Sequence, residues 1–140
     1  MSGRAFLDTN IFIYANDRRE PGKQAIARRL IREVTLSGNG AISYQVVQEF
    51  FNVVLTKTPQ KMGYEEARQF LTAVFVPILS IPSSVALVSD AMAIHERYRL
   101  SWYDSLIVAA AQRAGCDRLY SEDLQHGQLF GTLRVENPFL

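Results

Sequence analysis

The sequence predicts an α/β fold, a three-layer α/β/α sandwich around a central, mainly parallel sheet. Short apolar runs that are typical of buried strands alternate along the chain with longer segments of helical periodicity. Most connections between these expected strands contain a helix, which favours right-handed crossovers and a sheet covered on both faces. We expect one domain over residues 1–140, because this length is sufficient to bury a full core.

The first half of the chain alternates regularly between strand and helix. The expected elements are a strand at 4–8, a helix at 10–16, a helix at 23–36, a strand at 41–43 and a helix that runs to about residue 57. A polar loop, 16–22, separates the first two helices. The glycines in Ser37–Gly40 end the second helix, Ser43 is expected to cap the third, and Thr58–Pro59 breaks it.

The second half contains more helix than strand. The expected elements are a helix at 64–75, a strand at 76–81, helices at 85–98 and 104–114, and strands at 118–120 and 133–135. Pro77 fits a strand only near its start or at a sheet edge, because proline has no N–H to donate. Ser83 or Ser84 should cap the helix at 85–98. The helix at 104–114 is nearly all apolar, so we expect it to be buried, and Gly115 ends it.

The composition is that of an ordinary globular protein, with 48% apolar residues and a formal net charge of +1. No apolar run approaches the length of a membrane span, and the N-terminus has no signal-peptide pattern, so we expect a cytoplasmic protein. Cys116 is the single cysteine, so it can form neither an internal disulfide nor a thiolate cluster for zinc.

Positive charge is concentrated near the N-terminus, and no lysine follows Lys61. Residues 1–32 contain seven basic side chains, which are Arg4, Arg18, Arg19, Lys23, Arg28, Arg29 and Arg32. The helix at 23–36 has its apolar residues on one side and three of these arginines on the other. This basic face is either a solvated helix surface or a candidate contact for phosphate groups, and charge alone leaves both interpretations open.

Four acidic residues stand where an apolar run ends or a helix begins, and they are Asp8, Glu49, Asp104 and Asp123. Each alone could be a turn residue, a helix-terminal acid or an exposed helix residue. In a parallel α/β sheet, however, the working site lies beyond the carboxyl ends of the strands. Asp8 and Asp123 follow strands, Asp104 opens a helix, and Glu49 lies at the edge of an apolar helix face beside Gln45. We therefore expect these four acids to converge.

Converging carboxylates require a counterion. A close pair repels by about 4 kcal/mol at an effective dielectric constant near 20, so some would protonate unless a cation lay among them. Oxygen ligands of this kind suit Mg²⁺ or Mn²⁺ rather than zinc. Such metals lower the pKa of a water that attacks phosphorus and stabilise the leaving oxygen, while basic residues hold a nucleic-acid backbone. The chemistry that fits all these parts is hydrolysis of a phosphodiester.

The segments Phe6–Asn10, Val47–Phe50, Trp102–Ala111 and Leu119–Gly127 resemble the PIN domain family, most strongly the VapC-type toxins of bacterial and archaeal toxin–antitoxin pairs. The resemblance covers essentially the whole chain and implies a PIN-like nuclease domain. It also implies an endoribonuclease that depends on Mg²⁺ or Mn²⁺ and cleaves RNA. The implied partners are a small antitoxin protein and a second copy of the chain in a homodimer.

Within this resemblance, Asp8, Glu49, Asp104 and Asp123 match the four acidic positions of the family. Asp8 and Asp104 would be direct metal ligands, whereas Glu49 and Asp123 would bind the metal through water or polarise the attacking water. The polar positions that orient these carboxylates are matched by Thr9, Asn10 and Ser121. Glu122 competes with Asp123 for the fourth position, and Asp123 is favoured because the family's acid usually lies two places after a strand-end Ser or Thr.

Other functions would use a similar fold. A phosphate-receiving signalling module would need an early pair of acids and a late lysine, which this chain does not have. A haloacid-dehalogenase-type phosphatase would need a second aspartate where this chain has Asn10. The main alternative is a catalytically silent PIN-like module that binds RNA or protein. Such a module would normally have lost one or more of the acids, whereas all four are present here.

Overall fold

The computed structural model describes residues 3–57 and 61–140, and its centre is a six-stranded sheet in the order β3-β2-β1-β4-β6-β5. The strands are β1 (Arg4–Leu7), β2 (Gly40–Ser43), β3 (Leu79–Ile81), β4 (Cys116–Tyr120), β5 (Leu129–Phe130) and β6 (Leu133–Glu136). In the described residues β1, β2, β3, β4 and β6 pair in parallel, and β5 pairs antiparallel with β6. The predicted, mainly parallel sheet is therefore confirmed.

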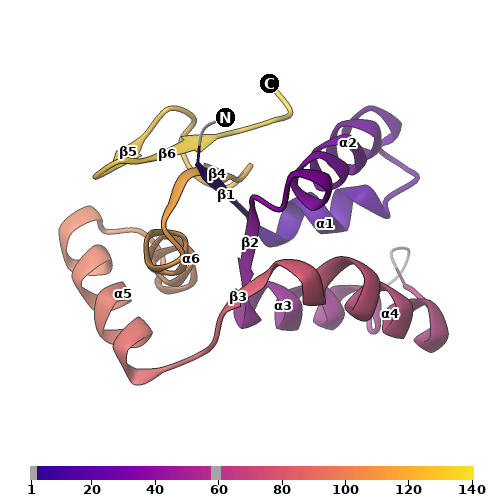
Figure 1. Ribbon diagram of the computed structural model, residues 1–140, viewed down its shortest axis with the longest axis horizontal. Helices are drawn as coiled ribbons and strands as arrows, with labels where there is room; N and C mark the ends of the chain where they lie inside the picture. Colours follow the sequence, from indigo (N-terminus) through magenta and orange to yellow (C-terminus); the bar gives the residue numbers. More distant parts are fainter. Residues whose placement is uncertain (1–2, 58–60) are drawn as a thin grey trace.

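Helices cover both faces of the sheet. They are α1 (Thr9–Ala15), α2 (Pro21–Ser37), α3 (Tyr44–Val54), α4 (Tyr64–Phe70), α5 (Val85–Tyr98) and α6 (Trp102–Arg113). Helices α1 to α4 lie on one face, and α5 and α6 lie on the other (Figure 1). The predicted three-layer sandwich is confirmed. Within residues 3–57 and 61–140, none of the helices combines the length and apolar character that crossing a membrane requires.

Several element boundaries differ from the prediction. Helix α2 already begins at Pro21, because a proline at the first helical position loses no hydrogen bond and has a helical φ angle. It ends at Ser37, and Gly38 follows in the left-handed conformation with a φ of 73°. Gly40 belongs to β2 and not to the segment that ends the helix. A glycine fits this position because a Cβ atom there would lie only 3.0 Å from the Val34 side chain.

The segment between α4 and β3 was predicted wrongly. The expected helix at 64–75 divides into α4 and a π-helical turn, η1 (Leu71–Phe75). Pro77 is not in a strand, because it lies in the 3₁₀ turn η2 (Val76–Ile78), and β3 starts only at Leu79. A proline is compatible with such a turn because the first residues of a helix need no N–H donor.

The predicted helix caps have mixed outcomes. Ser84 caps α5 as expected, since its side chain accepts a hydrogen bond from the Leu87 N–H. Ser43 precedes α3 but makes no capping hydrogen bond, and its buried hydroxyl has no partner in the described part of the chain. Helix α6 begins at Trp102, two residues earlier than expected, because Ser101 caps it. The predicted break at Thr58–Pro59 lies outside the described residues, and α3 ends at Val54.

An aromatic cluster in the core fixes the position of α3. Phe50 is fully buried, stacks on Phe70 with ring centroids 4.8 Å apart, and meets Phe75 edge-on at 5.1 Å. Aromatic pairs of this geometry contribute beyond the area that they bury. Because Glu49 directly precedes Phe50, the packing that anchors α3 also fixes the position along the helix axis from which the Glu49 side chain projects.

Candidate functional site

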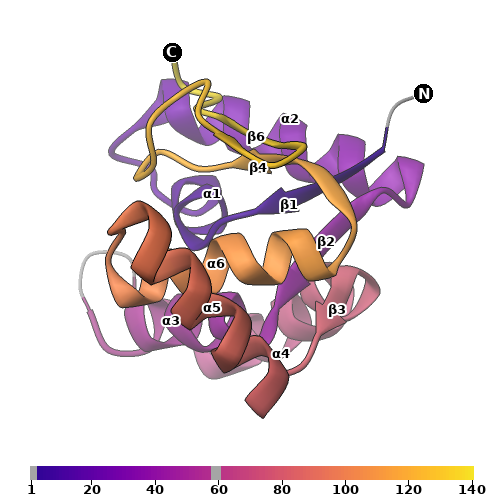
Figure 2. The ribbon, with the colours of Figure 1, turned by 90° about the vertical axis from the view of Figure 1, so that its left-hand side faces the viewer.

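The predicted acids gather where the direction of the sheet connections changes. Strands β1 and β4 are neighbours, with Leu7 opposite Tyr120, and the chain leaves β1 on one face and reaches β4 from the other. Figure 2, in which α5 and α6 face the viewer, shows β1 running toward the start of α1. In open α/β sheets, ligands bind at such a switch point beyond the strand ends. Asp8 follows β1 there, and Asp123 follows β4 after two further residues.

All four acids belong to one electrostatic cluster. The charges of Glu49 and Asp123 act on Asp8, and the charge of Asp104 acts on Asp123. In residues 3–57 and 61–140, no lysine or arginine forms an ion pair with any of them. We name Asp8, Glu49, Asp104 and Asp123 the acidic cluster. The four acids therefore lie within electrostatic range of one another, and in the described part of the chain no protein cation pairs with them.

Asp8 is the most buried member, with 4% of its surface exposed. It caps α1: its Oδ1 accepts a hydrogen bond from the Thr9 N–H at 2.7 Å, and its Oδ2 accepts one from the Ser121 hydroxyl at 2.8 Å. Burial raises the pKa of Asp8 to about 7, although both hydrogen bonds act in the opposite direction. The charges of Asp123 and Glu49 contribute to this rise. A cation at this position would relieve both the burial cost and the repulsion.

Glu49 is held by two side chains at the edge of the apolar face of α3. The Thr9 hydroxyl donates to its Oε1 at 2.6 Å, and the Gln45 amide donates to its Oε2 at 3.3 Å. The same Gln45 amide nitrogen also donates to the Tyr103 carbonyl in α6 at 3.1 Å. Gln45 therefore connects α3 to the first turn of α6. In the sequence it is only a polar neighbour of Glu49, and nothing in its spacing reveals this link.

Asp123 is oriented by Ser121 and Asn10, two residues for which the resemblance implies that they orient the carboxylates. Its N–H donates to the Ser121 hydroxyl at 3.1 Å, and its Oδ2 accepts a hydrogen bond from the Asn10 amide at 3.1 Å. Desolvation raises the pKa of Asp123 against the effect of this Asn10 contact, and the charge of Asp104 adds to the rise. The Oδ1 atom of Asn10 is buried without a hydrogen-bond partner in the described residues. An unused oxygen acceptor thus lies beside the acids.

Asp104 lies in the first turn of α6. Its N–H donates to the Ser101 hydroxyl at 3.1 Å, which fixes the backbone at this helix end. Its carboxylate makes no hydrogen bond or ion pair within the described part of the chain. A negative charge at a helix N-terminus is favoured by the helix dipole. The Asp104 carboxylate is therefore available to a ligand.

Glu122, the competing candidate for the fourth acid, is held by different residues. Its Oε1 accepts a hydrogen bond from the Tyr14 hydroxyl, and its Oε2 forms an ion pair with Lys23, each at 2.6 Å. Burial would raise the pKa of Glu122, but the Lys23 and Tyr14 contacts together lower it below its usual value. Glu122 is thus already paired with a cation, whereas Asp123 has none in the described residues.

The carboxylate oxygens suit a metal that prefers oxygen ligands, although they are not arranged in a complete metal-binding geometry. Among residues 3–57 and 61–140, no group of three or more His, Cys, Asp or Glu side chains is arranged to hold an ion. The carboxylates are instead oriented by Thr9, Ser121 and Asn10. The donor set nevertheless consists entirely of oxygens and is unneutralised, which is the chemistry that Mg²⁺ and Mn²⁺ select.

Comparison with known proteins supports the same fold. The model of the PIN domain family matches residues 5–129. The structure is similar to that of VapC20 from Mycobacterium tuberculosis, described as a sarcin-ricin loop cleaving toxin, with a TM-score of 0.59 and 17% identity over 84% of this chain and 88% of that chain. It is also similar to FitAcB from Neisseria gonorrhoeae, with a TM-score of 0.65 and 14% identity over 96% and 98% of the two chains. No curated protein sequence matches this chain.

Proposed function

The chain belongs to the PIN domain family, and from this premise we propose that it is a metal-dependent endoribonuclease that hydrolyses RNA phosphodiester bonds. The observation that carries the proposal is the acidic cluster at the β1–β4 switch point, which no lysine or arginine in the described residues neutralises. The similarity in fold to VapC20, whose description names a sarcin-ricin loop cleaving toxin, supports the choice of RNA over other phosphodiesters.

The proposal gives each acid the role that the resemblance to the family implies. Asp8 and Asp104 would bind Mg²⁺ or Mn²⁺ directly, and Glu49 and Asp123 would bind through water or orient the attacking water. The metal, when bound, supplies an acidified water and charge stabilisation at the leaving oxygen. Hydrolysis adds the water oxygen to phosphorus, breaks the bond to the leaving oxygen, and moves one proton from the water to that oxygen. The carboxylate of Glu49, which already accepts hydrogen bonds, is suited to accept that proton transiently.

Three side chains keep the carboxylates in place for this chemistry. Thr9 donates to Glu49, Ser121 donates to Asp8, and Asn10 donates to Asp123. Hydrogen bonds of this kind fix the orientation of metal ligands, and their loss typically lowers metal affinity about 10- to 100-fold. All three were assigned such supporting roles from the resemblance, and their contacts favour that assignment.

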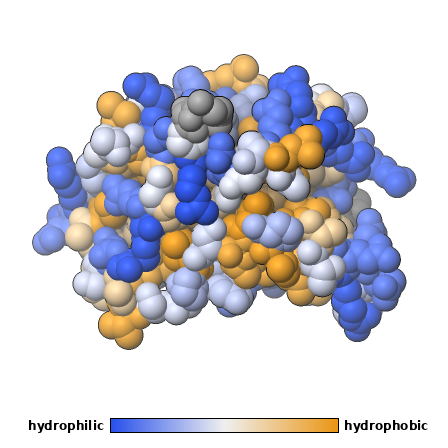
Figure 3. Space-filling model, in the orientation of Figure 1, coloured by the Kyte–Doolittle hydropathy of each residue, from blue (hydrophilic) through white to orange (hydrophobic). Residues whose placement is uncertain are grey.

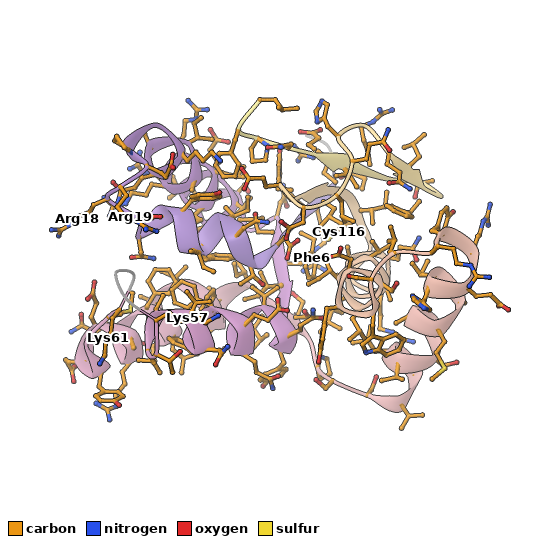
Figure 4. All side chains as sticks on the ribbon, turned by 180° about the vertical axis from the view of Figure 1, so that it is seen from behind. Phe6, Arg18, Arg19, Lys57, Lys61 and Cys116 are labelled. Atoms are coloured by element: carbon orange, nitrogen blue, oxygen red, sulfur yellow. The ribbon has the colours of Figure 1, made fainter. Side chains whose placement is uncertain are left out.

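A basic pocket supplies a contact for the RNA backbone. It has a volume of about 340 Å³ and lies past the end of α1, between the loop after α1, helix α2 and Lys61. Its lining includes four cationic side chains and two acidic ones, and Asp17 already pairs with Arg19. The cations are Arg18, Arg19, Arg28 and Lys61, and the acids are Asp17 and Glu66. Figure 4 shows Arg18, Arg19 and Lys61 at the same end of the molecule. Since α1 starts directly after Asp8 and ends beside this pocket, an RNA strand that crosses the acids can follow α1 to these cations.

Replacing Arg18 should reduce the salt dependence of RNA binding. Arg18 makes no ion pair in the described residues, so its charge is available to a phosphate. With single-stranded RNA and a chelator present to prevent cleavage, Arg18→Ala should lower the slope of log affinity against log salt by about 0.7. Fluorescence anisotropy over a salt series measures this slope. Arg97→Ala, on the distant helix α5, serves as the control, and an equal change in both variants would disprove the pocket's role.

We also propose that the protein is the cytoplasmic toxin of a toxin–antitoxin pair. Its protein partners would be a second copy of the chain, in a homodimer, and a small antitoxin. An apolar groove between α2 and η1 is a candidate antitoxin contact, and it is lined in part by Ile31, Leu36, Phe70 and Val74. Figure 3 shows apolar side chains gathered on this face of the molecule. Co-expression with the product of an adjacent short reading frame tests this role. The antitoxin should copurify with the chain and suppress its RNA cleavage.

Removing metal should distinguish the nuclease from the silent binding module. With Mn²⁺, the purified protein should cleave structured RNAs, and a chelator should abolish cleavage because the carboxylates alone cannot acidify the attacking water. Gel analysis of end-labelled RNA measures the products. A silent PIN-like module would instead shift the mobility of the RNA and leave it intact under both conditions. Protein with Asp8→Asn, prepared in parallel, controls for contaminating ribonucleases.

A further inference from the structure

We propose that Lys23 and Tyr14 are positioning residues that hold Asp123 in the acidic cluster through their contacts with the neighbouring Glu122. This inference rests on the proposed function, since it assigns a role within the same site. It also explains why two acids stand side by side after β4: one is a ligand candidate, and the other anchors the loop that carries it. We name Tyr14, Lys23 and Glu122 the clamp.

The clamp is closely packed. The Lys23 ammonium lies 2.6 Å from the Glu122 Oε2 and 3.2 Å from the Tyr14 hydroxyl, which itself donates to the Glu122 Oε1 at 2.6 Å. The ammonium also lies 4.6 Å from the centre of the Tyr14 ring and 5.5 Å from that of Phe139. These two rings meet edge-on at 4.9 Å. The lysine therefore contacts a carboxylate, a hydroxyl and two aromatic rings, which is more than an ordinary surface ion pair provides.

The clamp and the acidic cluster share one face of α1. Asn10 and Tyr14 are four residues apart, so their side chains lie on the same side of the helix, one turn from each other. Asn10 holds Asp123, and Tyr14 holds Glu122. The loop after β4 is consequently fixed to α1 at two successive points, with the two acids directed to different partners.

Loss of the clamp would leave Asp123 with less support. Among the described residues, its remaining side-chain contact is the exposed 3.1 Å hydrogen bond from the Asn10 amide, besides the bond from its own N–H to the Ser121 hydroxyl. A displacement of about 1 Å at a reacting centre can lower a rate about 100-fold. The charge of Glu122 also acts on Asp123. Lys23 compensates that charge, so removing Lys23 adds repulsion to the loss of orientation.

A double-mutant cycle with a metal readout tests the clamp. The variants are Lys23→Met, Glu122→Gln and their combination, with Lys23→Arg as the conservative replacement. Mn²⁺ alone is titrated into the full-length protein by calorimetry, and kcat and KM for RNA cleavage are measured separately. Arg113→Met is the matched control, because Arg113 on α6 forms a similarly short ion pair, at 2.7 Å, with Asp90 on α5.

The clamp predicts a specific pattern in these variants. Lys23→Met and Glu122→Gln should each weaken Mn²⁺ binding about tenfold and lower kcat, with KM within about twofold of the wild-type value. The combination should be no worse than either single variant, because both remove the same interaction. Lys23→Arg should retain most of the wild-type affinity, and Arg113→Met should leave both quantities unchanged.

Four results would overturn the clamp. Mn²⁺ affinity unchanged in Lys23→Met would show that Asp123 does not depend on it. A raised KM with normal kcat and metal affinity would make Lys23 an RNA contact instead. An equal loss in Arg113→Met would indicate general destabilisation. If the wild-type protein binds Mn²⁺ but leaves RNA intact, the proposed nuclease function is wrong, and the comparison of Mn²⁺ affinities still tests the clamp. If the wild-type protein binds no Mn²⁺, both proposals are wrong.

Discussion

Asp8→Asn should lower RNA cleavage by about 100- to 1,000-fold while the protein remains folded. The side chain is nearly isosteric, so the hydrogen bond from the Thr9 N–H can still be accepted by the amide oxygen. What is lost is the negative charge that would hold the metal, and removal of a group that stabilises transition-state charge typically has an effect of this size. Initial rates with saturating Mn²⁺ measure the change.

The control for Asp8→Asn is Asp90→Asn. Asp90 is also an aspartate in an ordered part of the molecule, but it lies on α5 and pairs with Arg113. Its replacement should leave the cleavage rate within about twofold of the wild-type rate, since surface ion pairs contribute little. If Asp8→Asn cleaves RNA as fast as Asp90→Asn, Asp8 is not part of the catalytic centre.

The second large effect concerns stability and pH in the absence of metal. Because the pKa of Asp8 is raised from 3.8 to about 7, the folded protein retains a proton that the unfolded chain releases near pH 4. The folded state therefore binds more protons between these values, and its stability falls as pH rises from about 4 to about 7. At 1.36 kcal/mol for each pKa unit, this contribution reaches up to about 4 kcal/mol.

Comparison with Asp8→Asn isolates this contribution from other titrating groups. An asparagine does not titrate, so the wild-type free energy of unfolding should fall relative to the variant across this pH range. Urea denaturation at pH 4.5, 6 and 7.5, with chelator present, provides the values. Above pH 7, Mn²⁺ should stabilise the wild type more than the variant. Parallel pH profiles for the two proteins would show that burial of Asp8 carries no such cost.

The sequence predicted the architecture because its strands are short apolar runs separated by helices. It could not predict β5, since Leu129–Phe130 is only a two-residue strand, formed by a tight turn in which Gly131 has a φ of 62°. Nor could periodicity show that the helix from residue 64 changes to π and 3₁₀ geometry before β3. Such changes depend on how the helix end packs rather than on local sequence preference.

The sequence could group the four acids because three stand at element boundaries near one edge of a parallel sheet. The fourth, Glu49, lies in the middle of α3, where only its place at the edge of the apolar helix face points to the site. Adjacency in the sequence, by contrast, cannot decide between Glu122 and Asp123. The difference arises from Lys23, which is distant in the chain and belongs to the basic segment near the N-terminus. Tyr14 and Gln45 likewise appear as ordinary helix residues, and only their neighbours in space give them a part in the site.

Anomalous diffraction from crystals soaked in Mn²⁺ tests the acidic cluster most directly. A manganese peak should appear at coordination distance, about 2.2 Å, from carboxylate oxygens of Asp8 and Asp104, with Glu49 and Asp123 near enough to bind its waters. A fully occupied manganese position elsewhere on the molecule, with these four side chains unchanged, would contradict the account.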